Sequence, residues 1–299
     1  MKSIKPRTLD HLKDFGCTVP ALVLILVFTY WPIVRLIQIS FTNWNLLNDS
    51  YKYVGFKNWK WLFTGSGTKY LLNSLKATII YSCGEILITL FGGLVLALIF
   101  NTEHHGYSVM RAVVFMPKYV AMSSAAVVFL WMLNTQYGVF NYFLTRMGFR
   151  PVDWLQDSHT AMLSVLMLTG WRAIGYGMII YLAAMRAISK DYYEAAELDG
   201  ATYWQSLRLI TLPLLTPTTL FLFVTTFLSS MKVFQSIDIL TGGGPYRSTE
   251  VFVYKIYQYA MVDFRMDRAA TMALAFFLLL LLCTAATMRI SRGRVNYES

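Results

Sequence analysis

The sequence predicts an all-α integral membrane protein with about six transmembrane helices, and three observations support this fold class. Of the 299 residues, 56% are hydrophobic and only 14% are charged, whereas a soluble domain carries about 25% charged residues. Residues 15–34, 119–145, 209–231 and 269–288 contain no charged side chain, and roughly 20 apolar residues cross a bilayer as a helix. Aromatic residues make up 16% of the chain, as expected where rings concentrate at both membrane interfaces.

Two further apolar segments, interrupted by charge, bring the number of expected spans to six. Helices are the expected form because lipid offers no partner to an open backbone and the sequence lacks the alternation of a membrane barrel. An even number of spans places both termini on the same side of the membrane. We expect helices over residues 17–39, 71–100, 112–133, 161–185, 212–231 and 269–288.

The Lys and Arg residues indicate which side faces the cytoplasm. With both termini inside, the inner segments carry as many Lys and Arg residues as the outer segments, in roughly two-thirds of the length. No connecting segment is long enough for a second folded domain. We therefore expect one membrane domain over 17–290, between cytoplasmic tails at 1–16 and 291–299.

Several functions are excluded by what the sequence lacks. The net charge of +10 comes from basic residues scattered over short connecting segments, which suits anionic lipid headgroups and not nucleic acid. No phosphate-binding loop of the form Gly-x-x-x-x-Gly-Lys-Ser/Thr is present. His104 and His105 have no carboxylate or cysteine cluster near them in the sequence, so we expect no metal site and no hydrolytic site.

Residues 187–212 connect the fourth and fifth spans and have the pattern of two short helices joined by a turn. Asp191 and Glu194 favour a helix start, and Gly200 favours a helix end. A second short helix with an aromatic and apolar face is expected to stop before Pro213. A rigid element of this kind, held between two membrane helices, is suited to docking in a groove of a partner protein.

The same segment carries a family motif. Glu194-Ala195-Ala196, Gly200, Ile210 and Leu212-Pro213 stand at the spacings of the EAA signature, and the sequence resembles the binding-protein-dependent permeases of ABC importers. One departure is Ser189, which stands where the family commonly has proline. Further matches point to the maltose-type sugar-permease subfamily: the segment 40–45, Phe115-Met116-Pro117, Trp131, Gly138, Asn141, Gly148, Trp171-Arg172 and the Gly-rich segment 241–245.

The resemblance implies a transport subunit without enzymatic activity or bound cofactor. It implies import of a carbohydrate by alternating access across the cytoplasmic (inner) membrane of a bacterium, with an oligosaccharide favoured over a monosaccharide, a uronide or glycerol phosphate. The implied partners are a homologous second permease subunit in a heterodimer, two copies of a cytoplasmic ABC ATPase that holds ATP and Mg²⁺, and an extracytoplasmic solute-binding protein. The implied contacts of the coupling segment with the ATPase are Glu194, Ala195, Ala196, Asp199, Gly200, Ile210, Leu212 and Pro213.

Arg172 and Glu85 lie near the middle of expected spans, where a charge costs ~2.5–3.5 kcal/mol on insertion scales. Arg172 has two interpretations: it donates hydrogen bonds to a solute, or it pairs with Glu85 or with the partner subunit. For Glu85 an interhelical pair is favoured over a proton relay.

Polar residues on the fourth and fifth spans are candidates for the solute path. Ser229, Ser230, Lys232, Phe234 and Gln235 combine hydroxyl, amide and ring groups, which suits a sugar that has both hydroxyl groups and a C–H face. The alternative is that hydroxyl groups here join helices to one another. The positions that the resemblance places on the path are Thr169, Arg172, Ala173, Tyr176, Thr226, Ser229, Ser230 and Val233, to which we add Gln235.

Two other classes compete with an ABC permease. A secondary transporter would use Glu85 and Arg172 with an ion gradient, and this class more often shows internal symmetry between its halves and discontinuous helices at the midplane. A membrane-embedded enzyme would need clustered His or acidic residues inside the spans. The sequence shows none of these features.

Overall fold

The structure is a computed structural model that describes residues 7–48, 50–102 and 105–291. Part of the expected N-terminal tail, all of the C-terminal tail except Ser291, and His104 lie outside these ranges. Within them the chain is helical, and an isolated bridge between Thr42 and Tyr53 is the one pairing of extended backbone.

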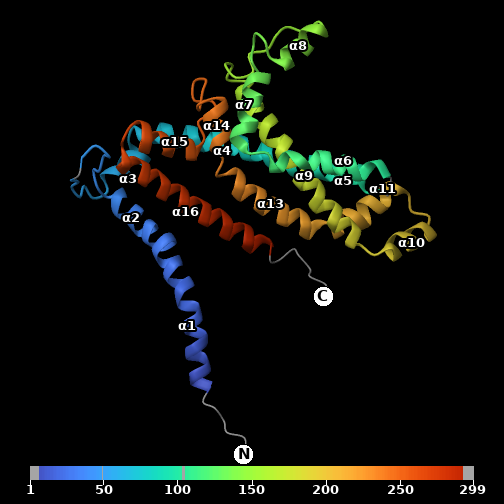
Figure 1. The fold of residues 1–299 in the computed structure, drawn as a ribbon, viewed down its shortest axis with the longest axis horizontal. Coiled ribbons are helices and arrows are strands. Elements are labelled where there is room, and N and C mark those ends of the chain that lie inside the picture. Colours follow the sequence, from blue (N-terminus) through green and yellow to red (C-terminus); the bar gives the residue numbers. More distant parts are fainter. Residues whose placement is uncertain (1–6, 49, 103–104, 292–299) are drawn as a thin grey trace, which may run out of the picture. The chain divides into compact units, whose positions relative to one another are not determined.

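The chain divides into two compact units. The first comprises residues up to Thr68 together with Ile256–Ala275, and the second comprises Lys69–Lys255 together with the residues from Phe276 onward. In chain order (Figure 1) the helices are α1 (Arg7–Ile25), α2 (Trp31–Ser40), α3 (Lys57–Thr64), α4 (Gly67–Leu87), α5 (Gly93–Phe100), α6 (His105–Phe115), α7 (Met122–Met132), α8 (Val139–Arg146), α9 (Ala161–Ala187), α10 (Lys190–Leu198), α11 (Tyr203–Ser206), α12 (Leu212–Leu214), α13 (Thr216–Ser230), α14 (Gln235–Leu240), α15 (Phe252–Tyr257) and α16 (Met266–Ser291).

The expected membrane helices are present, and four of them are continuous. Among the described residues, Thr18–Ser40, Gly67–Phe100, Ala161–Ala187 and Met266–Thr287 are long and apolar enough to cross a membrane. Short π-helical turns join α1 to α2 and α4 to α5 without ending the span: η1 (Leu26–Tyr30) and η2 (Ile88–Gly92). The other two expected spans are bent pairs of helices.

The expectation of a continuous third helix over 112–133 is wrong. Helix α6 gives way to a single 3₁₀ turn, η3 (Met116–Tyr119), and α7 then leaves at an angle of 101° to the preceding helix. Pro117 has no N–H for a helical hydrogen bond, and Val120 and Ala121 are extended, with ψ of 131° and 133°. The hydropathy of the segment is continuous, but the backbone is not. The expectation that the chain has no discontinuous helix is therefore wrong as well.

The fifth span is also bent, at Leu215. The helical run Tyr203–Leu214 meets α13 at 59°. The second helix of the connecting segment was expected to stop before Pro213, and this expectation is wrong because the helix runs past Pro213. It continues through a π-helical turn, η4 (Leu207–Thr211), into α12. Such turns, like prolines, are common at helix kinks because both change the regular backbone hydrogen bonding.

Helix α9 is the central element of the second unit, and glycines bring its neighbours close. It runs beside α5 (Figure 1). A Cβ added to Gly177 would lie 2.2 Å from the carbonyl oxygen of Thr89, and one added to Gly175 would lie 2.2 Å from that of Val114. Small residues allow this close approach in membrane proteins, where packing drives helix association.

In the first unit, the segment after α2 is held by side chains of α3 and α16. The Asn58 amide donates to the carbonyls of Ser40 and Thr42 at 3.0 and 2.7 Å. The Thr271 hydroxyl donates to Ser40 at 3.3 Å, and the Asp267 N–H donates to the carbonyl of Trp44 at 3.0 Å. The segment 40–45, which matches the sugar-permease subfamily in sequence, is therefore held in place by these contacts.

Candidate functional site

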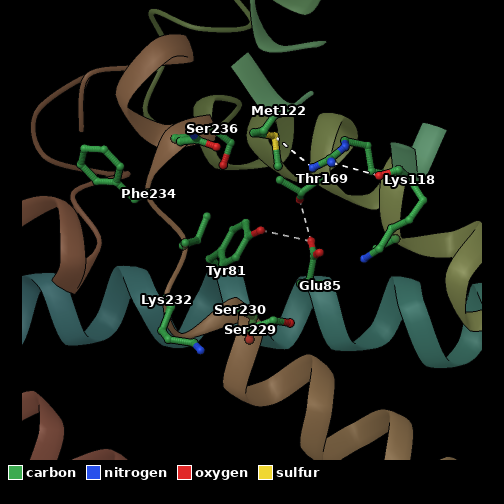
Figure 2. Close-up of a pocket in the computed structure, with 14 residues that line it drawn as sticks. Tyr81, Glu85, Lys118, Met122, Thr169, Ser229, Ser230, Lys232, Phe234 and Ser236 are labelled. Carbon is green, nitrogen blue, oxygen red and sulfur yellow. Dashed lines mark hydrogen bonds between the residues drawn. The ribbon is translucent and has the colours of Figure 1, made fainter. Parts of the chain in front are cut away.

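A polar cavity of about 420 Å³ lies in the second unit, among the membrane helices. Four parts of the chain form its wall: α4, the break between α6 and α7, α9, and the junction of α13 with α14 (Figure 2). A polar site among apolar helices is unusual because each unsatisfied polar group in lipid costs several kcal/mol. The lining residues are Tyr81, Glu85, Lys118, Met122, Thr169, Arg172, Ala173, Ser229, Ser230, Lys232, Val233, Phe234, Gln235 and Ser236.

Glu85 joins α4 to α9 through hydrogen bonds to one carboxylate oxygen. The Thr169 hydroxyl donates to Glu85 Oε2 at 2.6 Å, and the Tyr81 hydroxyl donates to the same oxygen at 3.2 Å (Figure 2). Tyr81 precedes Glu85 by one helical turn, so both side chains lie on the same face of α4. Glu85 therefore joins two helices through the neutral partner Thr169, and the described residues show no interhelical ion pair for it.

Arg172 uses its guanidinium on the backbone of the broken third span. Its Nη2 donates to the carbonyls of Lys118 and Val120 at 3.2 and 2.9 Å, and its Nε donates to that of Pro117 at 3.3 Å. The Pro117 carbonyl also accepts the Val120 N–H at 3.2 Å. The 3₁₀ turn and extended residues leave the carbonyls of Lys118 and Val120 without regular helical partners, and Arg172 supplies donors for them. Among the described residues, no ion pair joins Arg172 to Glu85, so the expected alternative of an Arg172–Glu85 pair is wrong.

Two lysines and a serine complete the polar wall. Lys118 lies in the break, with its Nζ 4.7 Å from the centroid of the Tyr176 ring. Lys232 follows the end of α13 and is exposed. The Ser236 side chain is fully buried, and its Oγ has no hydrogen-bond partner among the residues described.

Most of the residues predicted for the solute path meet at this cavity. Thr169, Arg172, Ala173, Ser229, Ser230, Val233 and Gln235 line it. Tyr176 and Thr226 do not line it: Tyr176 contacts Lys118, and Thr226 is buried. The sequence analysis did not select Tyr81, Lys118, Met122 or Ser236 for the path. The spacing of Tyr81 from Glu85 was the available signal for the tyrosine.

The second candidate site is the segment between α9 and α13, where two short helices and a tight turn are present as expected. Ser189 caps α10 by accepting a hydrogen bond from the Asp191 N–H at 3.3 Å, which supplies the helix start that the family commonly obtains from proline. Gly200 has φ of +74°, a value that glycine adopts without the penalty of a side chain. Thr202 and Gln205 then form a capping box at the start of α11.

The outer surface of this segment carries large hydrophobic residues beside charged ones. Leu198 is 89% exposed and Trp204 is 73% exposed, although both are large hydrophobic residues. On the inner side, the Tyr193 hydroxyl lies 3.0 Å from Thr211 Oγ1 and joins α10 to η4. Glu194, Ala195, Asp199 and Gly200 are exposed, as are Leu212 and Pro213, whereas Ala196 and Ile210 are half-buried. The segment is a folded element with an uncovered apolar face.

The described residues contain no group of three or more His, Cys, Asp or Glu side chains that could hold a metal ion. The chemistry of the cavity is therefore that of hydroxyl, ammonium, guanidinium, carboxylate and aromatic groups. Such groups bind and orient a polar solute by hydrogen bonds and ring contacts.

Known proteins that are similar to this chain include permease proteins of transport systems. The chain is 32% identical over 279 residues to the sn-glycerol-3-phosphate transport system permease protein UgpA of Agrobacterium fabrum, covering 93% of this chain and 94% of that protein. It is 30% identical to the probable ABC transporter permease protein YurN of Bacillus subtilis, covering 91% and 93% of the two chains.

A solved structure has the same fold along almost the whole chain. It is a bacterial alginate ABC transporter in complex with alginate pentasaccharide-bound periplasmic protein, at a TM-score of 0.84 and 25% identity, covering 97% of this chain and 98% of that one. Residues 89–296 match the family described as the binding-protein-dependent transport system inner membrane component. The chain belongs to this family and is a membrane-embedded permease subunit of an ABC transporter, not an enzyme.

Proposed function

We propose that this chain forms half of the pore of a carbohydrate importer and that the solute passes through the polar cavity. The observation that carries the proposal is the placement of hydroxyl, amide and aromatic groups from four parts of the chain around one space within the spans. A sugar needs hydrogen bonds for its hydroxyls and a ring for its C–H face. Ser229, Phe234 and Gln235 offer these groups from the junction of α13 with α14.

Energy for transport comes from a separate ATPase subunit in this proposal. The exposed apolar face around Leu198 and Trp204 is suited to a groove of that subunit, with Glu194 and Gly200 at the contact. Binding of ATP with Mg²⁺ by two ATPase copies, followed by hydrolysis of the ATP, would move the segment 187–212. This movement would shift the walls of the cavity through α9 and α13.

The remaining partners follow from the relatives. UgpA is described as part of a glycerol-3-phosphate transport system, and the alginate transporter binds a periplasmic protein loaded with a pentasaccharide. For this chain we propose an extracytoplasmic binding protein that delivers a carbohydrate, an oligosaccharide in preference, and a homologous second permease subunit. The membrane is the cytoplasmic membrane, the membrane domain spans 17–290 and both tails face the cytoplasm.

A cavity-filling substitution tests the solute path. Ala173 lines the cavity on α9, so Ala173→Phe places a ring in the space, and Ala173→Ser serves as the matched control. The solute is first identified by titrating the binding protein with a panel of glycans. In proteoliposomes containing the complete importer, its binding protein and ATP, we expect Ala173→Phe to abolish uptake of this solute. Assembly with the ATPase should be unchanged in both variants.

Two outcomes would overturn the proposal. Wild-type uptake by an assembled Ala173→Phe importer would place the solute path elsewhere. Uptake by this chain alone, driven by a proton gradient without ATPase subunits, would make it a secondary transporter that uses Glu85 and Arg172.

A further inference from the structure

The charged groups of the cavity are mostly cationic. Lys118, Arg172 and Lys232 line it, and Glu85 is the one carboxylate among the described lining residues. Three positive charges facing one negative charge give the space a net positive potential when all four are ionised. A low-dielectric wall strengthens such a potential relative to water.

The negative charge of Glu85 is already engaged by the protein. Its Oε2 accepts hydrogen bonds from Thr169 and Tyr81, which hold the carboxylate against α9 and α4. Three of the five N–H donors of Arg172 are engaged on the carbonyls of the break, and its Nη1 donates to Met122 Sδ at 3.5 Å. Arg172 therefore contributes charge to the cavity, but most of its hydrogen bonds go to the backbone.

The two lysines remain available to a solute. Neither Lys118 nor Lys232 forms an ion pair with a described carboxylate. In Figure 2 their ammonium groups lie on opposite sides of Glu85. An ammonium group is a compact charge that accepts several geometries of anion, so both a carboxylate and a phosphate group fit this arrangement.

Ser236 adds an independent indication of a ligand. Its hydroxyl is buried, lines the cavity and has no partner among the residues described. A buried hydroxyl without a hydrogen bond is costly. Ser74 and Ser82 share this state away from the cavity, so it is the cavity position of Ser236 that links it to a ligand. Ser229 and Ser230 donate to carbonyls of their own helix, so their oxygens present lone pairs to hydroxyls of a sugar.

We propose that the imported carbohydrate is anionic and carries a carboxylate or phosphate group that pairs with Lys118 or Lys232 while its hydroxyls meet the serines. This inference rests on the proposed function, since it takes the cavity as the solute path. It names the class of solute, which the fold and the coupling segment leave open.

The test uses three sugars that differ only at carbon 6: glucose, glucuronate and glucose 6-phosphate. Their binding to the assembled importer in nanodiscs is measured by saturation-transfer difference NMR, a method suited to weak ligands. The variants are Lys232→Gln and Lys118→Gln. Lys69→Gln is the matched control, because this exposed residue lies on α4 roughly 24 Å along the axis from Glu85 and removes the same charge outside the cavity.

We expect at least one anionic sugar to bind more tightly than glucose. The smallest free energy usual for a hydrogen bond to a charged group corresponds to about a tenfold change in affinity. We therefore expect Lys232→Gln or Lys118→Gln to reduce the affinity for the anionic sugar by about this factor, while Lys69→Gln leaves it unchanged. The preference should also weaken as salt is raised. Comparison of glucuronate with glucose 6-phosphate distinguishes a carboxylate from a phosphate solute.

Each contrary result has a separate meaning. Equal binding of glucose and both anions would overturn the anionic class and leave the cavity as the solute path. An anion preference that survives both lysine substitutions would overturn the assignment of the charge recognition to Lys118 and Lys232. Absence of binding by all three sugars to the wild-type importer would overturn this inference, whereas the proposed function is decided separately by uptake in the Ala173→Phe importer.

Discussion

The guanidinium of Arg172 on α9 donates a 2.9 Å hydrogen bond to the carbonyl oxygen of Val120, across the break in the third span. Further bonds reach the carbonyls of Pro117 and Lys118. A broken helix is tolerated at membrane depth only where its free backbone groups find partners in the protein or in a cavity. Arg172 thereby stabilises the bend that brings Lys118 to the cavity wall.

Substitution of Arg172 should therefore act on stability before it acts on solute affinity. Arg172→Met keeps much of the side-chain length but removes every donor, and each lost hydrogen bond to a charged group is worth about 1.5–3 kcal/mol. We expect a clearly lower Tm of the purified complex. Arg172→Lys should recover part of the Tm, because one ammonium group cannot reproduce the fork of a guanidinium.

The measurement is thermal unfolding of the complex beside the KM for uptake. A normal Tm with a raised KM in Arg172→Met would contradict the structural role and restore the interpretation that Arg172 binds solute.

Close helix contact at Gly177 gives a second prediction. A Cβ at this position would lie 2.2 Å from the Thr89 carbonyl oxygen, so Gly177→Ala must push α9 away from η2. Overpacking of this kind costs about 1–3 kcal/mol and should lower the Tm of the complex. Gly16→Ala is the control: a Cβ at Gly16 would have no atom within 4 Å, and alanine favours a helix. Equal Tm values for the two variants would show that α9 and η2 separate easily.

The spans were predictable from the sequence, whereas the breaks in them were not. Hydropathy reports whether a segment suits lipid, and residues 112–133 do so along their whole length. The break follows from Pro117 together with Arg172, which is 55 residues away along the chain, and a long-range hydrogen bond leaves no trace in a hydropathy pattern. The same reason explains Ser236: a buried hydroxyl on a short helix has no sequence signature.

Membrane orientation is tested by cysteine labelling. In a background without Cys17, Cys83 and Cys283, single cysteines replace Ala187 at the end of α9 and Tyr246, both of which are exposed. With the termini inside, an impermeant maleimide added to intact cells should label position 246, and position 187 only after permeabilisation. Labelling of position 187 from outside would invert the topology and place the segment 187–212 on the wrong side for an ATPase.

The turn at Gly200 provides the sharpest test of coupling. Its φ of +74° lies in the left-handed region, and no atom lies within 4 Å of a Cβ built there. A side chain is therefore opposed by backbone strain and not by a clash within this chain. A β-branched residue pays on the order of 1–2 kcal/mol in this region, whereas asparagine tolerates it. Gly200→Val should displace α11 relative to α10, and Gly200→Asn should leave the turn intact.

The functional consequence should appear at the ATPase and not at the solute. We expect Gly200→Val to weaken co-purification with the ATPase subunit and to abolish binding-protein-stimulated ATP hydrolysis and uptake, with Gly200→Asn near wild type. Glu194→Lys should have the same effect as Gly200→Val, because Glu194 is exposed and a reversed charge opposes a basic partner. The affinity of the binding protein for its sugar and the membrane insertion of the variants should not change.

If Gly200→Val retains ATPase association and stimulated hydrolysis, the segment does not transmit the motion. If Gly200→Asn fails as completely as Gly200→Val, the contact with the ATPase tolerates no side chain at position 200. The strain argument would then be wrong, but the position would still be part of the contact.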